Sequence, residues 1–92
     1  MEQILRAHVF VYGEVQGVFF RRTAKSKAEE LGIVGWVRNK PDGSVETVAQ
    51  GLKSGVEKFI VWCKKGPPFA KVEKVEVEWK KSPEDFEDFS II

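Results

Sequence analysis

The chain contains a single cysteine, Cys63, and a single histidine, His8, among its 92 residues. One cysteine excludes an internal disulfide and any cysteine-based metal cluster, and it favours a reducing, cytoplasmic setting. No apolar run has the length of a membrane span, and the first six residues lack the apolar core of a signal peptide. Fifteen basic and fourteen acidic side chains leave a net charge of only +1. That balance provides no bulk field for nucleic acid or an acidic membrane, so we expect neither partner.

The size and the apolar content suit one compact domain. Hydrophobic residues make up 42% of the chain, which is ordinary for a globular protein and too high for a disordered one. We therefore expect residues 1–92 to form a single domain, with a monomer as the expected state.

Hydrophobic periodicity predicts an alternating order of strands and helices. We predict strands at residues 5–13, 33–38, 44–51 and 74–80. Apolar residues alternate in the first and the last of these, and a strong turn at residues 39–43 joins the middle two as a hairpin. Helical spacing predicts helices at 22–31 and 54–65, the second opened by a capping box from Ser54 to Glu57. The order strand-helix-strand, strand-helix-strand indicates an α+β, ferredoxin-like split βαβ fold (βαββαβ), with two helices on one face of a mainly antiparallel sheet. Residues 86–92 are apolar enough to add a short C-terminal edge strand.

The segment between the first predicted strand and the first predicted helix, residues 13–21, is the main candidate for a binding site. Its two glycines permit a tight backbone path, and no Ser, Thr, Asp or Asn precedes Thr23 to cap the helix. Uncapped first-turn amides and the helix dipole favour an anion, and Arg21 adds a planar donor fork. This pattern predicts a phosphate pocket, although its spacing matches neither the P-loop nor the dinucleotide fingerprint. The alternative is an ordinary strand-to-helix connection with a surface arginine.

The predicted topology brings Arg21 close to a second polar residue, Asn39. In a split βαβ unit the first two strands run parallel, so their ends meet at one edge of the sheet, with the third strand between them. Taken alone, Asn39 is more often a strand-end or turn residue, since an asparagine before Pro-Asp-Gly is good turn chemistry. His8 is excluded from this site, because it lies on the order of 16 Å up the strand at about 3.3 Å per residue. Cys63 falls on the apolar stripe of the second helix and is predicted to be packing.

The carboxylates near the C-terminus, residues 84–88, superficially suggest a metal site. Four acidic side chains beside a proline are more typical of a solvent-facing segment, so we expect no metal there.

Two blocks of the sequence resemble the signatures of the acylphosphatase family. Residues 13–21 (GEVQGVFFR) resemble its signature loop. Residues 28–32 (AEELG), 35–39 (GWVRN) and 42–46 (DGSVE) resemble its second signature. The resemblance extends over nearly the whole chain, because Gly51, the Gly-Pro-Pro stop at 66–68 and the valine-rich last strand also match.

The resemblance implies an acylphosphatase that hydrolyses the carboxyl–phosphate anhydride of small acyl phosphates without metal or cofactor. It implies that Arg21 binds the phosphoryl group and that Asn39 positions the attacking water. Inorganic phosphate or sulfate is expected as a product-like ligand. The implied phosphate cradle consists of the backbone amides of Val15, Gln16, Gly17, Val18, Phe19 and Phe20.

Two other functions remain open at this point. A non-catalytic anion-binding or regulatory domain could use the same fold, since fold does not determine function. An RNA-binding module is disfavoured, because residues 44–51 lack the aromatic-glycine pattern of such modules and the charge is balanced.

Overall fold

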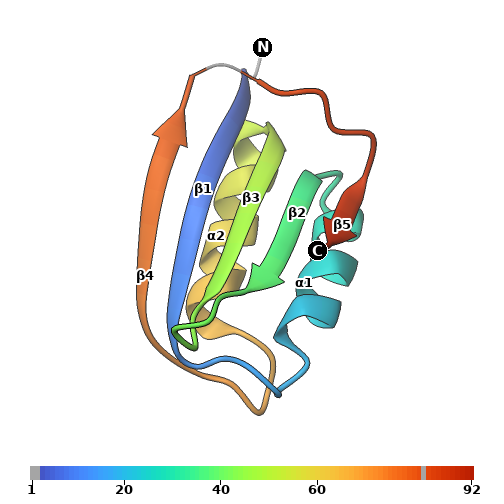
Figure 1. Ribbon diagram of the computed structural model, residues 1–92. Coiled ribbons are helices and arrows are strands. Elements are labelled where there is room, and N and C mark those ends of the chain that lie inside the picture. The colour runs from blue at the N-terminus through green and yellow to red at the C-terminus, as the bar shows by residue number, and fades with distance from the viewer. Residues whose placement is uncertain (1–2, 82) are drawn as a thin grey trace.

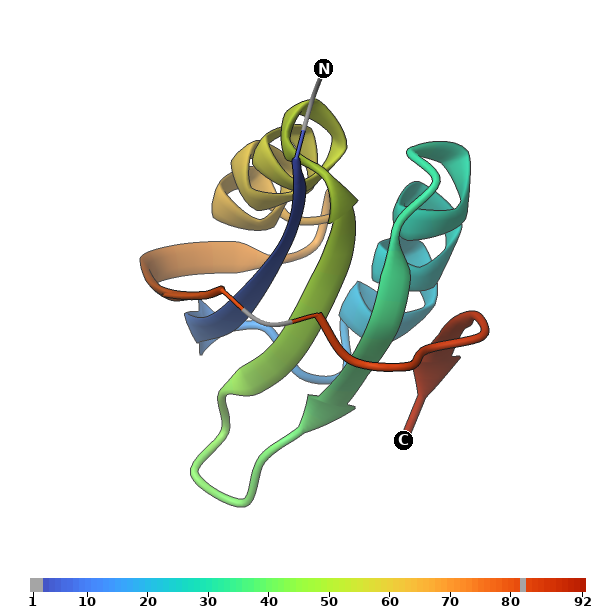
Figure 2. The ribbon, with the colours of Figure 1, turned by 90° about the horizontal axis from the view of Figure 1, so that it is seen from above.

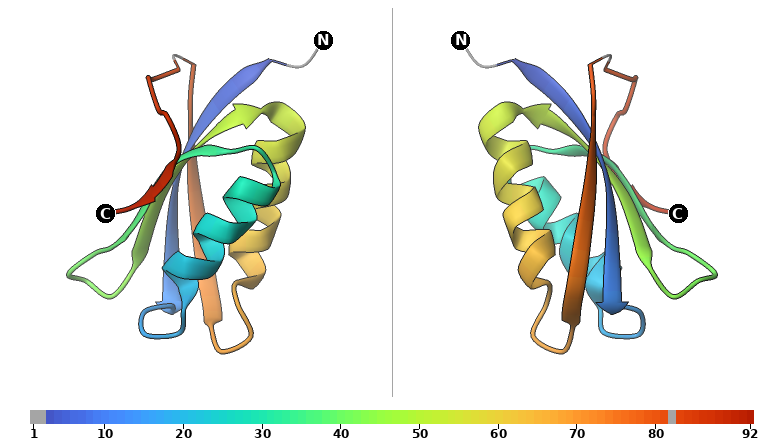
Figure 3. Two further views of the ribbon diagram at one scale, coloured as in Figure 1. Left: turned by 90° about the vertical axis from the view of Figure 1, so that its right-hand side faces the viewer. Right: turned by 90° about the vertical axis from the view of Figure 1, so that its left-hand side faces the viewer.

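The computed structural model describes residues 3–81 and 83–92, which form a five-stranded sheet covered on one face by two helices. The elements follow in the order β1 (Ile4–Glu14), α1 (Phe20–Glu30), β2 (Val34–Asn39), β3 (Val45–Leu52), α2 (Lys53–Lys65), β4 (Lys71–Lys80) and β5 (Phe89–Ile91). The strand order is β4-β1-β3-β2-β5, and all pairs are antiparallel except β2 with β5 (Figure 1). Both helices lie on the same side of the sheet (Figure 3). The predicted ferredoxin-like α+β fold is confirmed, including the short edge strand.

The core lies between the helices and one face of the sheet. Alternate residues of β1 (Ala7, Val9 and Val11) are fully buried there, as the period of two predicts. The helices contribute stripes at helical spacing, and these stripes consist of Phe20, Ala24 and Ala28 from α1 and of Val56, Phe59, Ile60 and Cys63 from α2. Among the described residues, no helix has both the length and the apolar character needed to cross a membrane.

The predicted capping box at the start of α2 is wrong. The N-cap is Leu52, which makes no side-chain cap hydrogen bond, so Ser54 lies inside the first turn. The physical reason is that β3 continues to Leu52 and leads directly into the helix, with the Lys53 amide donating to Gln3 O at 3.1 Å. No residues are left over for a separate capping turn.

A β-bulge interrupts the pairing of β4 with β1 near the end of β1. Because Val72 is out of phase with Val75, Val77 and Trp79, the sequence predicts a bulge or bend before Val75. Tyr12 pairs with Lys74 but Gly13 pairs with Val72, so Glu73 is the extra residue of this bulge. Gly13 adopts φ 127°, and a Cβ at this position would lie 2.2 Å from Lys71 O. Only glycine fits this close approach of β1 to β4. The chain leaves the sheet one residue later, after Glu14.

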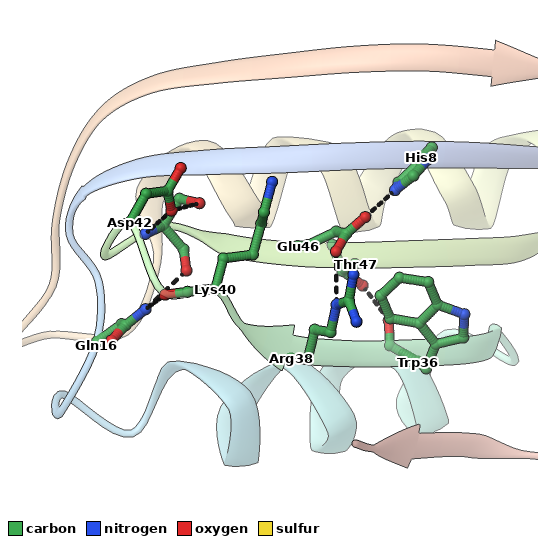
Figure 4. Close-up of polar contacts among 9 residues, drawn as sticks. His8, Gln16, Trp36, Arg38, Lys40, Asp42, Glu46 and Thr47 are labelled. Carbon is green, nitrogen blue, oxygen red and sulfur yellow. Dashed lines mark hydrogen bonds and ion pairs between the residues drawn. The ribbon is translucent and has the colours of Figure 1, made fainter.

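The other face of the sheet carries a hydrogen-bonded network centred on the buried side chain of Glu46. Glu46 on β3 accepts hydrogen bonds from His8 Nε2 on β1 and from Arg38 Nε on β2, both at 2.6 Å (Figure 4). The Glu46 side chain is only 7% exposed. Burial by itself raises the pKa of Glu46, but the bonds from His8 and Arg38 outweigh it and hold the pKa below its ordinary 4.5. The network therefore links three neighbouring strands.

We expect Glu46→Gln to lower the free energy of unfolding near pH 7 by about 2–3 kcal/mol, because two donors lose their ionised acceptor. Since the folded-state pKa is lowered, the carboxylate stabilises the fold fully above about 4.5 and stops doing so as the pH falls through the lower value. Urea unfolding near pH 7 and near pH 3 should show a difference between variant and parent that shrinks in acid. The exposed Glu78→Gln is the matched control. An undiminished Glu46→Gln effect in acid would contradict the role of ionisation.

Residues 83–88 lie on the side of the sheet away from the helices and lead to β5, at the edge opposite β4 (Figure 2). Gln50 on β3 anchors this segment through two bonds with the main chain of Glu84, at 2.9 and 2.8 Å. At the far edge Phe89 is buried against the core, and its carbonyl accepts a bond from Lys25 Nζ at 2.7 Å. These contacts fix β5 beside β2.

Candidate active site

A cavity of about 380 Å³ opens where β1 and β2 end and α1 begins. Both Arg21 and Asn39 line it. They lie together because β1 and β2 both run antiparallel to β3, so the chain leaves both strands at the same edge of the sheet. This is the juxtaposition that the topology predicts. The full lining consists of Val15, Gly17, Phe19, Phe20, Arg21, Arg22, Asn39 and Ile91.

Unpaired main-chain amides lie at the start of α1, beside this cavity. Phe19 is the N-cap, with φ 66° and ψ 22°, and makes no side-chain cap bond. Within residues 3–81 and 83–92, no protein acceptor receives a hydrogen bond from the N–H groups of residues 15–22. The first helical bond at this end is donated by the Thr23 amide to Phe19 O, at 3.0 Å. Amides at the positive end of a helix without internal partners form a binding site for an anion.

Two arginines add positive charge at the same helix end. Arg21 and Arg22 are exposed in the first turn, which contains no acidic residue. In the part of the chain that the structure describes, neither guanidinium forms an ion pair or a hydrogen bond. A positive charge at the N-terminus of a helix interacts unfavourably with the helix dipole, which costs roughly 0.3–1 kcal/mol of stability. Arginines placed there without a protein counter-ion favour binding of an external anion such as phosphate.

Asn39 points into the cavity from the end of β2. It has the same strand parity as Val37, which is fully buried on the helix side, whereas Arg38 lies on the opposite face with Glu46. The Asn39 Oδ1 atom is buried and has no hydrogen-bond partner within residues 3–81 and 83–92. Burying a carbonyl oxygen without a partner costs roughly 1–3 kcal/mol. Such an atom at the wall of a cavity is available to a donor inside it.

The Gln16 side chain connects the loop to the β2–β3 hairpin. Its Nε2 group donates to Lys40 O at 2.7 Å and to Ser44 O at 2.9 Å (Figure 4). Because Lys40 directly follows Asn39, these two bonds fix the position of the loop relative to the asparagine. The sequence reasoning assigned Gln16 only a backbone amide and missed this side-chain function. The only signal was the polar side chain itself, between apolar neighbours.

The other predicted cradle residues divide into two groups. Val15, Gly17, Phe19 and Phe20 line the cavity, whereas Gln16 and Val18 do not. Val18 is half-buried and packs on the core. Two further residues line the cavity that the sequence pattern does not assign to the site: Arg22 in the first turn of α1 and Ile91 on the edge strand.

The side chains that could support other chemistries lie elsewhere or are occupied. His8 is bonded to Glu46 on the far face of the sheet. Cys63 is fully buried in α2, and burial raises the pKa of its thiol, which makes it unsuited to act as a nucleophile. Glu84 pairs with Arg6, and Asp88 accepts a bond from Ser90 at 2.7 Å. Among the described residues, no group of three or more His, Cys, Asp or Glu side chains could hold a metal ion.

Comparison with known proteins places the chain in a defined family. A sequence model of the acylphosphatase family matches residues 7–91. The chain is 50% identical to an acylphosphatase of Roseiflexus sp. over 92 residues, which is all of this chain and 99% of the relative. It is also 50% identical to an acylphosphatase of Pyrobaculum calidifontis, over 98% of this chain and 83% of that protein.

A solved structure agrees with these sequence matches. The acylphosphatase of Bacillus subtilis superimposes with a TM-score of 0.93 at 38% identity, covering 96% of this chain and 98% of that one. The chain with the arginine-and-amide cavity described above therefore belongs to the acylphosphatase family.

Proposed function

We propose that this enzyme hydrolyses small acyl phosphates to a carboxylate and inorganic phosphate by direct attack of water on the phosphoryl group. In this proposal Arg21 and the amides of residues 15–20 hold the phosphoryl group, and Asn39 orients the water. The observation that supports it most is the presence, in one cavity, of unpaired amides, an unpaired Arg21 guanidinium and the unpartnered Asn39 Oδ1. No metal or cofactor takes part in the proposed reaction.

Donors on the loop fit the charge of the substrate. In phosphoryl transfer the negative charge is spread over the equatorial oxygens, and catalysis depends mainly on positioning and on stabilisation of that charge. Backbone amides at a helix N-terminus are fixed in direction and need no reorganisation as the reaction proceeds. The guanidinium of Arg21 adds two parallel donors to two phosphoryl oxygens. The cradle therefore favours the transition state electrostatically.

The leaving group needs no acid. A carboxylate has a conjugate-acid pKa of roughly 4, so it departs as an anion near neutral pH. Asn39 cannot accept a proton at that pH, but its Oδ1 atom can accept a hydrogen bond from water and aim the oxygen lone pair at phosphorus. The proton of the water passes to a phosphoryl oxygen in this scheme. The absence of histidine or cysteine from the cavity lining is compatible with such a reaction.

Hydrolysis of acetyl phosphate and benzoyl phosphate, measured with excess chelator and corrected for spontaneous hydrolysis, tests the proposal. We expect turnover that the chelator does not reduce. Binding of inorganic phosphate without turnover of either compound would instead indicate the non-catalytic anion-binding domain.

The bond pair from Gln16 provides a test of loop positioning. Gln16→Ala should lower kcat on the order of tenfold, because the loop loses its register with Asn39, and small misplacements are costly in rate. Inhibition by inorganic phosphate should change little, since the cradle amides remain on one loop. Gln50→Ala is the matched control, because Gln50 also donates its side-chain amide to a main-chain carbonyl, at 2.9 Å, but far from the cavity. Equal kcat for the two variants would refute the positioning role.

A further inference from the structure

Two large apolar side chains border the cavity and have no role in holding a phosphoryl group. Phe19 is 63% exposed and Ile91 is 43% exposed, and both line the cavity. Single exposed apolar residues are common on protein surfaces. Here, however, two of them come from separate elements, the loop before α1 and the edge strand β5, and meet at the same anion site. We call this pair the apolar rim.

The backbone holds Phe19 in an uncommon conformation that keeps its ring out of the core. Its φ of 66° lies in the left-handed region, which bulky side chains rarely adopt. Thr23 fixes it there, because its amide and its hydroxyl both donate to Phe19 O, at 3.0 and 2.8 Å. The next residue, Phe20, is 2% exposed and fills the core. One phenylalanine thus packs inside while its neighbour is held at the cavity.

Strand pairing places Ile91 next to Asn39. β5 runs parallel to β2 with Val37 opposite Ile91, and Asn39 follows two residues later on the same face. The Ile92 amide donates to Val37 O at 2.9 Å, which fixes the end of the strand. Ile92 has the opposite strand parity and is not part of the cavity lining, although it is 63% exposed. Only one of the two isoleucines therefore borders the site.

The substrate offers one group that can occupy this rim. When the phosphoryl group lies in the amide cradle, the acyl part must extend out of it along the bridging oxygen. We propose, on the basis of the proposed function, that Phe19 and Ile91 form an acyl subsite that favours aryl and branched-alkyl acyl phosphates over acetyl phosphate. An apolar acyl group would cover both side chains, and an aromatic one would also stack against the Phe19 ring.

The test compares kcat/KM for benzoyl phosphate and for acetyl phosphate in matched variants. Ile91→Ala should lower the ratio of the two values about three- to tenfold, because contact with a few methyl groups discriminates on that scale. Phe19→Gly, which accepts the positive φ, should lower it at least as much. Ile92→Ala should leave the ratio at the parental value. Inhibition by inorganic phosphate should be the same for Ile91→Ala and the parent.

A third substrate addresses the remaining charged residue of the lining. Arg22 also borders the cavity, so 4-carboxybenzoyl phosphate, which keeps the aryl shape and adds a carboxylate, probes an acidic acyl group. A higher kcat/KM for this compound than for benzoyl phosphate, lost in Arg22→Ala, would overturn the apolar subsite. An unchanged benzoyl-to-acetyl ratio in both rim variants would also overturn it, while leaving the proposed hydrolysis intact. No turnover of any of these compounds by the parent would overturn the proposed function itself, and the subsite with it.

Discussion

Arg21→Ala should lower kcat/KM for benzoyl phosphate by a factor on the order of 10²–10³, which corresponds to about 3–4 kcal/mol of lost transition-state stabilisation. The first turn of α1 contains two guanidinium groups, those of Arg21 and Arg22. The Arg21 guanidinium has no counter-ion among the described residues. Without this guanidinium, the cradle amides must stabilise the phosphoryl charge with no formal positive charge beside them at this position. Steady-state kinetics with correction for spontaneous hydrolysis measure the loss.

The neighbouring arginine supplies the matched control for this prediction. Arg22 lies in the same helical turn and also borders the cavity, so Arg22→Ala removes the same formal charge from the same helix end. We expect Arg22→Ala to cost less than about tenfold, because a charge without directed bonds is screened by solvent. Arg21→Lys should recover little activity, since a point charge does not replace two parallel donors. Equal losses for Arg21→Ala and Arg22→Ala would contradict a specific role for Arg21.

The strong local patterns of the sequence predicted the fold because each has a direct physical cause. The alternation in β1 buries Ala7, Val9 and Val11, and the bulge expected from the phase of Val72 occurs at Glu73. The uncapped helix start was also predictable, because no capping side chain precedes Thr23. The start of α2 was not, since a capping box assumes a turn before the helix, and here β3 continues straight into it.

Within the site, the sequence predicted the placements that follow from the strand topology. Two strands that run in the same direction with a third between them bring Arg21 and Asn39 to one edge, whatever the details of packing. The contributions of Gln16 and Ile91 depend on tertiary contacts that no local period encodes. Gln16 needs the hairpin carbonyls within reach, and Ile91 needs the parallel pairing of a three-residue strand. The contribution of such residues to the site can be recognised only from the three-dimensional arrangement of the elements.

Hydrogen bonds of the two residues that flank Asn39 restrain the end of β2. Arg38 precedes Asn39 and donates to the buried Glu46, while Lys40 follows it and accepts from Gln16. The hydrogen bonds of its two chain neighbours thus fix the backbone position of Asn39. A water-orienting amide benefits from this arrangement, because rate falls steeply when a reacting group is misplaced.

Asn39→Ala should therefore separate binding from turnover. Asn39 is the single asparagine of the chain, and in the proposed mechanism its Oδ1 atom contacts the water and not the phosphoryl group. We expect kcat to fall by at least about 10²-fold, since an unpositioned water attacks rarely. The inhibition constant of inorganic phosphate should change less than about threefold, because Arg21 and the amides are untouched.

The Arg21 variant provides the opposite pattern and so makes the Asn39 result decisive. Arg21→Ala should weaken phosphate inhibition and turnover together, because one guanidinium serves both the ground state and the transition state. If Asn39→Ala weakened phosphate inhibition as much as turnover, the carboxamide would be a phosphate ligand and another group would have to orient the water. Asn39→Asp sharpens the comparison, because it preserves the shape but brings a negative charge to the phosphoryl oxygens. That variant should lose both phosphate inhibition and turnover by like-charge repulsion.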